Sequence, residues 1–264
     1  VCLTGRLLRH WSPATGEVVG CARGQGGERY PLGSVMPVTE DGRQYIPFRP
    51  IVLAGDDVTF VSDGRLGITL AAAYLEDFES AMRAQDNADV GDLEACAGVA
   101  IVKAHYPFAR AYGLAEDLCA NAKTAWCRKC SALDWHIAAS GLFGDVRDIR
   151  ARQYAVSSGH LEMRPLRLRE QEGQWRSWPA FCRVLQTFLL DREWKGRRNK
   201  VIALRQALRD GPEAVKRFLR AYGPSELPDP GAGSPVLRQT GWEDGYSGYF
   251  DAVEALDFFV PLEG

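Results

Sequence analysis

The 264-residue sequence lacks several patterns that would assign it to a common class of protein. It contains no run of about 18 apolar residues, which excludes an apolar membrane-spanning helix. It also lacks a Ser/His/Asp set, a phosphate-binding Gly-Lys-Ser/Thr loop and an HExxH pair, so common hydrolase, NTPase and zinc-protease signatures are missing. There is no charged-then-apolar leader, and the first residue is Val1. We therefore expect a cytoplasmic segment that begins inside a longer polypeptide.

The cysteines do not form the pattern of a disulfide framework. There are seven, an odd number scattered along the chain, which favours reduced thiols in a cytoplasm. Cys127 and Cys130, with Cys119 upstream, make half of a zinc pattern. A structural zinc site needs four ligands, and no second pair follows downstream. We therefore favour cysteines at the end of a helix over a zinc site.

The formal net charge of −2 hides two segments of opposite charge. Residues 54–95 carry ten acids and two bases, whereas residues 147–220 carry eighteen bases and eight acids. The acidic segment could hold cations, and the basic segment could bind polyanions. Alternating charges on solvated helix faces are the simpler explanation for either segment.

Two adjacent acids, Asp56 and Asp57, lie between two short apolar runs. Each run is rich in β-branched and aromatic residues and is typical of a strand, so Ala54 and Gly55 with the two acids predict the tip of a hairpin. Gly accepts positive φ and Asp bonds to nearby backbone, so a turn explains one acid. The second acid repels the first, and the pair is most useful where a divalent cation neutralises it.

The periodicity of the chain predicts an α+β fold. Helical spacing after the hairpin predicts an amphipathic helix, and two later apolar runs predict strands separated by a second helix. We read the run at 95–106 as a strand buried on both faces. Strands alternating with packed helices favour an RRM- or ferredoxin-like palm, with a mainly antiparallel sheet and helices on one face.

We expect three parts along the chain. Residues 1–43 are rich in turn formers and read as a connecting segment or short ribbon. Residues 44–170 form the predicted palm. Residues 171–264 form a C-terminal helical module, in which Pro212 occupies a favoured first-turn position. No internal repeat is present.

The order of these elements, with "AGDD", "GVAIVKAHYPFARAYGLAEDLCANAK" and "SALDWHIAAS", resembles the palm domain of the large, polymerase- or cyclase-like subunit of type III CRISPR effector complexes, of the second-palm type. That family is related to GGDEF-type diguanylate cyclases, and more distantly to polymerases and adenylyl cyclases. The resemblance covers roughly residues 44–264 and is specific in residues 49–140. "LEMRPLRL" and "DAVEALDFF" are also similar to the tails of such proteins.

The resemblance implies an antiviral nucleotidyltransferase that joins ATP molecules into cyclic oligonucleotides. Asp56 and Asp57 would be the catalytic metal ligands for Mg²⁺ or Mn²⁺, and Ala54, Gly55 and Lys103 would lie against the nucleotide. The chain departs from the family pattern at Ala54, where the motif has Gly. It also lacks the strand and helix that precede the hairpin in a palm, so either these lie upstream or the palm is incomplete.

Other candidate residues have simpler explanations. Lys103 and His105 are two apart at a strand end, so we expect both on one face, with Lys103 able to hold a phosphate and His105 structural. Asp63-Gly64 reads as a turn and helix cap. His136 reads as a core residue.

The basic cluster Lys195, Arg197, Arg198 and Lys200 has no interleaved exposed aromatics, so it reads as the start of a helix rather than a nucleic-acid contact.

Two other functions stay open. One is a catalytically inactive palm that serves as a scaffold and binds RNA or effector-complex subunits through its basic helical half. The other is a nuclease that uses the same acids, for which no further ligand is visible. A homodimer is compatible with either a palm enzyme or a scaffold, and no membrane partner is expected.

Overall fold

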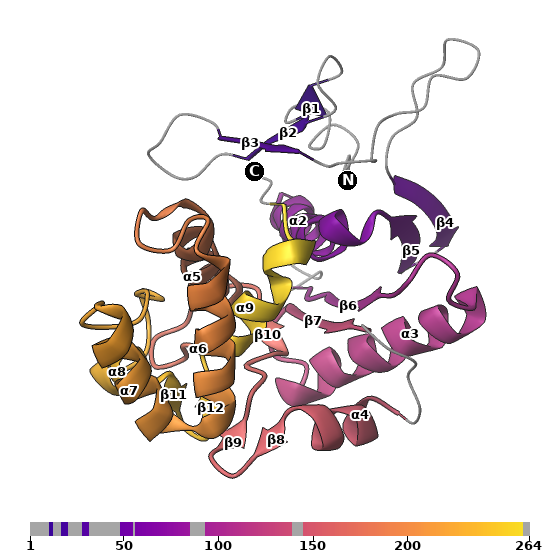
Figure 1. Cartoon of the computed structure of the whole chain (residues 1–264). Coiled ribbons are helices and arrows are strands. Elements are labelled where there is room, and N and C mark those ends of the chain that lie inside the picture. Colours follow the sequence, from indigo (N-terminus) through magenta and orange to yellow (C-terminus); the bar gives the residue numbers. More distant parts are fainter. Residues whose placement is uncertain are drawn as a thin grey trace. The chain divides into compact units, whose positions relative to one another are not determined.

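The structure is a computed structural model that describes residues 48–54, 56–84, 93–138 and 145–260, together with the backbone of three short strands near the N-terminus. It is a mixed α+β protein, drawn in Figure 1. The chain forms two compact units. Unit 1 contains Val1–Leu93 and Asp257–Gly264, and unit 2 contains Glu94–Leu256.

Unit 1 contains two small antiparallel sheets and one long helix. The N-terminal strands β1 (Trp11–Ser12), β2 (Glu17–Gly20) and β3 (Glu28–Pro31) form one sheet, which agrees with a short ribbon in residues 1–43. Strands β4 (Phe48–Ala54) and β5 (Asp57–Ser62) form the predicted hairpin. Helix α2 (Gly64–Arg83) follows and confirms the helix predicted from spacing.

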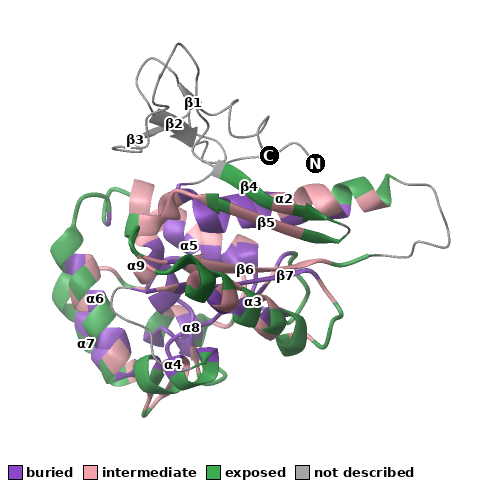
Figure 2. Ribbon diagram, turned by 90° about the vertical axis from the view of Figure 1, so that its right-hand side faces the viewer, coloured by how far each residue is buried: buried purple, intermediate pink, exposed green. Residues whose placement is uncertain are grey.

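Val260, near the C-terminus, is hydrogen-bonded to α2 within unit 1. Thr69 Oγ1 donates a hydrogen bond of 2.7 Å to the backbone oxygen of Val260, and the Val260 N–H donates to the backbone oxygen of Arg65 at 3.1 Å. The segment Leu66–Ala73 of α2 is buried (Figure 2). The start of α2, which follows the hairpin directly, is therefore held in a packed environment.

Unit 2 begins with a strand, a helix and a strand: β6 (Cys96–Ile101), α3 (Phe108–Ala125) and β7 (Ala132–Ile137). Strands β6 and β7 pair in parallel, which requires a crossover connection such as α3. Strand β10 (Leu166–Arg167) adds antiparallel to β7. At Gly98 the helix approaches β6 so closely that an added Cβ would lie 2.1 Å from the backbone oxygen of Ala115.

The remainder of unit 2 is mostly helical. The helices are α4 (Val146–Gln153), α5 (Trp178–Leu190), α6 (Arg198–Asp210), α7 (Pro212–Tyr222), α8 (Pro235–Thr240) and α9 (Phe250–Ala255), and the strands are β8 (Ala155–Val156), β9 (Gly159–His160), β11 (Trp242–Glu243) and β12 (Tyr246–Ser247). Helices α6 and α7 pack together, α7 packs on α8, and the short α9 packs against both α5 and α6 (Figure 1). The four strands form a second small sheet with the order β11-β12-β9-β8.

Several local predictions are confirmed. Pro212 starts α7, and α3 is the second predicted helix, between β6 and β7. The basic cluster does open a helix, since α6 begins at Arg198.

The predicted sheet is wrong in three respects. The described strands form four separate sheets rather than one, and the hairpin belongs to a different compact unit from β6 and β7. The pairing of β6 with β7 is parallel, because α3 carries the chain back to the same end of the sheet. Strand β6 is also shorter than the apolar run and is buried only at Ile101, because it lies at the sheet edge.

The compact units do not coincide with the parts expected from sequence. Unit 2 joins the second half of the predicted palm, residues 44–170, to most of the helical module, residues 171–264. No boundary between compact units lies at residue 170, so the division into a palm and a helical module stays a prediction.

Candidate functional site

The two acids lie at a tight hairpin tip, as the sequence predicts. Ala54 pairs with Asp57 and Leu53 pairs with Val58, so the loop between β4 and β5 contains only Gly55 and Asp56. Gly55 itself falls outside the described part of the chain. Asp57 is the first residue of β5. The tip therefore presents one acid from the loop and the next from the start of a strand.

Both carboxylates are accessible. Asp56, Asp57 and Ala54 are all exposed, as is Leu53, at 71%. Mg²⁺ in nucleotide sites is commonly held by one or two carboxylates, with waters and substrate phosphates completing the octahedron. An exposed pair of adjacent acids fits that requirement. Over residues 49–54, 56–84, 93–138 and 145–260, no cluster of three or more His, Cys, Asp or Glu side chains is arranged to hold a metal.

The hairpin is followed directly by the capped start of α2. The Asp63 side chain accepts hydrogen bonds from the backbone N–H of Arg65 at 3.0 Å and from its guanidinium at 2.8 and 3.1 Å. Partial burial of Asp63 opposes ionisation, but the hydrogen bonds and charge of Arg65 outweigh it and lower the pKa. This confirms the predicted cap of α2, which begins two residues after the end of β5.

The structure corrects the expected placement of Lys103 and His105. Strand β6 ends at Ile101, and the Tyr106 N–H donates to the backbone oxygen of Lys103 at 2.9 Å, so both residues lie in a turn. The alternation of a strand does not apply there. Both side chains are exposed, and Lys103 belongs to unit 2, whereas the two acids belong to unit 1. Its nucleotide-binding role stays a prediction.

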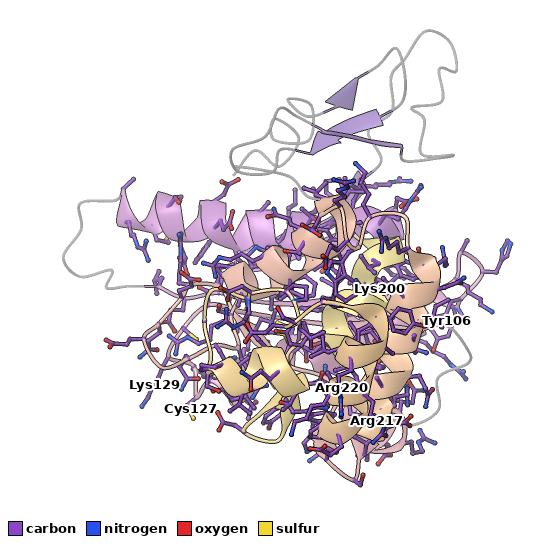
Figure 3. All side chains as sticks on the ribbon, turned by 60° about the vertical axis from the view of Figure 1, so that its left-hand side comes forward. Tyr106, Cys127, Lys129, Lys200, Arg217 and Arg220 are labelled. Atoms are coloured by element: carbon purple, nitrogen blue, oxygen red, sulfur yellow. The ribbon has the colours of Figure 1, made fainter. Side chains whose placement is uncertain are left out.

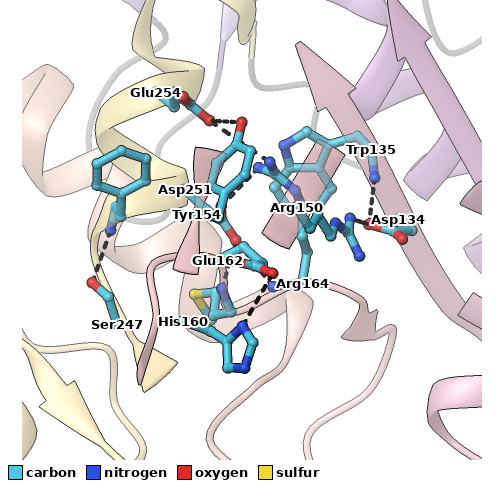
Figure 4. Close-up of polar contacts among 12 residues, drawn as sticks. Asp134, Trp135, Arg150, Tyr154, His160, Glu162, Arg164, Ser247, Asp251 and Glu254 are labelled. Atoms are coloured by element: carbon cyan, nitrogen blue, oxygen red, sulfur yellow. Dashed lines mark hydrogen bonds and ion pairs between the residues drawn. The ribbon is translucent and has the colours of Figure 1, made fainter. Parts of the chain in front are cut away.

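Sequence reasoning missed a network of buried charges in unit 2 (Figure 4). Arg164 and Asp251 are both fully buried, and Arg164 Nη1 donates to Asp251 Oδ1 at 2.7 Å. The other oxygen of Asp251 accepts from the backbone N–H groups of Met163 and Arg164 at 2.9 and 3.0 Å. Burial raises the pKa of Asp251 to about 6, although the charge of Arg164 acts in the opposite direction.

A second ion pair continues the network. Arg150 Nη2 donates to Asp134 Oδ1 at 2.5 Å, and Tyr154 Oη donates to Glu254 Oε2 at 2.8 Å (Figure 4). His136 lies in the core, as predicted, with its ring 6.1 Å from that of Tyr154. Burial, together with the charges of Arg164 and Arg150, lowers the pKa of His136 to about 3.

The geometry of the network gives it a structural role. Its charges come from β7, α4, the segment before β10 and α9, and each carboxylate faces at least one cation or backbone donor. Breaking such a pair leaves a buried charge without compensation. The sequence signal was an isolated Asp134 in an apolar strand, but nothing local identifies its partner.

The remaining candidates are separated. Cys127 is exposed in the turn after α3, whereas Cys119 lies inside that helix and donates to the backbone oxygen of Cys96 at 3.3 Å. This arrangement agrees with cysteines near a helix end. Lys200 is buried and lies 4.1 Å from the centroid of the Trp194 ring, so it is not part of an exposed basic cluster.

Comparison with known proteins adds no relative: no family model and no curated protein matches the chain. None of the helices in the part of the chain that the structure describes is both long and apolar enough to cross a membrane.

Proposed function

We propose that this protein is a palm-type nucleotidyltransferase, or a nucleotide-binding relative of one, in a prokaryotic defence system related to type III CRISPR. It binds ATP with Mg²⁺ or Mn²⁺ at Asp56 and Asp57. The observation that carries the proposal is the pair of exposed carboxylates at a two-residue hairpin tip. The sequence resemblance over residues 49–140 supports the same assignment.

The role of the two acids follows from their position. Both carboxylates reach solvent, so they can neutralise a divalent ion without a large desolvation cost. When bound, such ions activate the attacking hydroxyl and neutralise charge on the phosphates. The hairpin presents the acids, and the capped start of α2 follows it directly. Ala54 adds a methyl group where the family motif has Gly, at a position that is exposed.

Incubation of the chain with ATP and Mn²⁺ tests the proposal, with products separated by chromatography. We expect cyclic or linear oligonucleotides from the unmodified chain, and none from D56N/D57N or after chelation of the metal. D117N is the matched control, because Asp117 is an exposed acid on α3, in unit 2, whereas the hairpin belongs to unit 1. It should retain the full yield.

Nucleotide binding is measured separately by thermal unfolding. At ATP a hundredfold above its Kd, binding adds about 2.7 kcal/mol to the free energy of unfolding, so the melting temperature should rise with ATP and metal. The rise should disappear in D56N/D57N. If the unmodified chain gives neither product nor a rise in melting temperature, the nucleotide-binding proposal is wrong.

A second candidate function is an inactive palm that acts as an RNA-binding scaffold. Arg217 and Arg220 are exposed on α7 (Figure 3). A hydrogen bond of 2.7 Å from Lys216, together with the charges of Lys216, Arg217 and Arg220, lowers the pKa of the exposed Glu213, so three cations lie near this acid. Such a cluster can contact phosphates without reading sequence. The double variants R217E/R220E and R197E/R198E should then weaken RNA binding and reduce its salt dependence. Unchanged affinity in both would contradict this candidate.

A further inference from the structure

We propose that unit 2 binds single-stranded nucleic acid at a row of stacked arginine and aromatic side chains beside the C-terminal end of α3. The inference does not depend on the nucleotidyltransferase proposal, and it names a surface other than the basic face of α7. The members of this arginine–aromatic row, in order of contact, are Arg167, Trp126, Arg176, Tyr246 and His160.

The row is continuous. The guanidinium carbon of Arg176 lies 5.5 Å from the centroid of the Trp126 ring and 4.1 Å from that of Tyr246. Arg167 lies 5.3 Å from the Trp126 ring. At the other end, the rings of Tyr246 and His160 stack at 5.4 Å with an interplanar angle of 24°. Cations over aromatic faces within about 6 Å attract the ring quadrupole, so the contacts support one another.

Backbone contacts hold the row in place. Trp126 Nε1 donates to the backbone oxygen of Pro165 at 3.2 Å, and Arg176 Nε donates to that of Met163 at 2.6 Å. Tyr246 and His160 are partners in the pairing of β12 with β9. The rings are therefore ordered before any ligand arrives, which reduces the entropy that binding must overcome.

Two exposed cations extend the row at the end of α3. Arg128 and Lys129 follow Trp126 directly and are exposed, and Figure 3 shows Lys129 and Cys127 at the surface. Across the described residues, no acid forms an ion pair with these two side chains or with Arg167 and Arg176. Arg128 and Lys129 thus add two exposed cations to the two arginines that belong to the row.

The turn that carries Arg128 is itself unusual. Cys127 and Arg128 have φ of 53° and 55°, in the left-handed region that non-glycine residues seldom adopt. Their N–H groups donate to the backbone oxygens of Thr124 and Lys123, both at 3.0 Å, which fixes the turn. The exposed cations are therefore presented by an ordered turn at the end of α3.

These features match the requirements of a single strand of nucleic acid. Proteins bind such strands with cations that follow the phosphates and with aromatic or arginine planes on which bases stack. The His160 side chain is 52% exposed and provides an open ring at one end of the row. Packing explains Arg176, whose guanidinium is hydrogen-bonded, and the stacking of His160 on Tyr246 together with its 3.7 Å approach to Glu162 explains the position of that ring. Packing does not explain the exposed Arg128 and Lys129.

Fluorescence anisotropy of the full chain tests the proposal, with labelled oligouridylate and oligothymidylate as probes. The RNA and DNA arms show whether the 2′-hydroxyl contributes. H160A should weaken binding at least about fivefold and leave its salt dependence unchanged, because it removes a stacking surface. R128E/K129E should weaken binding and reduce the slope of log K against log salt by about 1.4, which corresponds to two phosphate contacts on a single strand.

Two matched variants serve as controls. R147E/R152E makes the same charge change at two exposed arginines on α4, and Y222A removes a half-exposed ring outside the row. Both should bind as the unmodified chain does, and so should D56N/D57N, which separates this proposal from the nucleotidyltransferase.

Two results would overturn the proposal. One is that the unmodified chain binds neither probe at low salt. The other is that R217E/R220E weakens binding while H160A and R128E/K129E do not. Circular dichroism of each variant checks that it is folded.

Discussion

Replacement of Asp251 by Asn should destabilise the protein strongly, because it removes the nearer counter-ion of a buried arginine and leaves only Glu254, 3.7 Å from Arg164 Nη2. Arg164 and Asp251 have no exposed side-chain surface, and their charged atoms are 2.7 Å apart. Asn has nearly the same shape as Asp, so the substitution changes charge and hydrogen bonding rather than volume. Its amide supplies only one oxygen, so either the Arg164 guanidinium or the backbone N–H groups of Met163 and Arg164 would face an amide donor.

The expected loss in the free energy of unfolding is about 3–5 kcal/mol, the usual effect of removing one partner from a buried ion pair. Each kcal/mol shifts the melting temperature of a domain of this size by about 2–4 °C, so we expect a decrease of roughly 6–20 °C. Urea unfolding followed by tryptophan fluorescence measures the change. Trp135 is a convenient reporter, because Arg164 lies 5.4 Å from its ring.

A double-mutant cycle with R164M separates the pair from a general loss of packing. The double variant R164M/D251N should lose much less stability than the sum of the single variants, because it leaves no buried charge unpaired. D117N provides the matched control and should stay within about 0.5 kcal/mol of the unmodified chain. A loss below about 1 kcal/mol in D251N, or additive losses in the cycle, would refute this account of the network.

Three further predictions concern single positions. Because the pKa of His136 is lowered to about 3 from 6.5, the unfolded chain binds more protons between these values, and stability should fall as pH falls through that window by about 1.4 kcal/mol per unit. Relative to the unmodified chain, H136Q should lose this slope in urea unfolding between pH 7 and 5, and an unchanged slope would contradict the assignment. G98A should lower the free energy of unfolding by about 1–3 kcal/mol, because its Cβ would overlap the backbone of α3. G113A, whose Cβ would have no atom within 4 Å, should raise the free energy of unfolding by up to about 1 kcal/mol. Equal effects of the two variants in thermal unfolding would contradict the close packing at Gly98. D63A should lower the free energy of unfolding by about 0.5–2 kcal/mol, because α2 would lose its N-cap. An unchanged free energy of unfolding would show that the Asp63 cap does not stabilise α2.

Features encoded by neighbouring residues were predictable from sequence. The hairpin tip follows from a Gly-Asp pair between two apolar runs, and α2 follows from residues spaced on one face with Asp63 before it. Pro212 marks the start of α7 for the same local reason, since its missing N–H is not needed in the first turn.

Features that depend on distant partners were not predictable. The apolar run at 95–106 fixes neither the parallel pairing of β6 nor the point at which it ends, because both depend on where α3 returns the chain. Arg164 and Asp251 are 87 residues apart, and nothing in either local sequence distinguishes a buried ion pair from two surface charges. The arginine–aromatic row likewise combines five segments that are separate in sequence.

The contrast between the two pairs of charged residues determines how the function can be tested. Asp56 and Asp57 are exposed at the hairpin tip, and their mutual repulsion contributes nothing to folding, so D56N/D57N should leave stability within about 0.5 kcal/mol or raise it slightly. Variants of the buried Arg164 and Asp251 would instead lower any activity through unfolding. A loss of nucleotide binding in D56N/D57N with an unchanged melting temperature in the absence of ATP therefore reports on the site itself. If D56N/D57N unfolds as readily as D251N does, the tip is structural, and the two acids would have to be explained by the fold rather than by a metal ion.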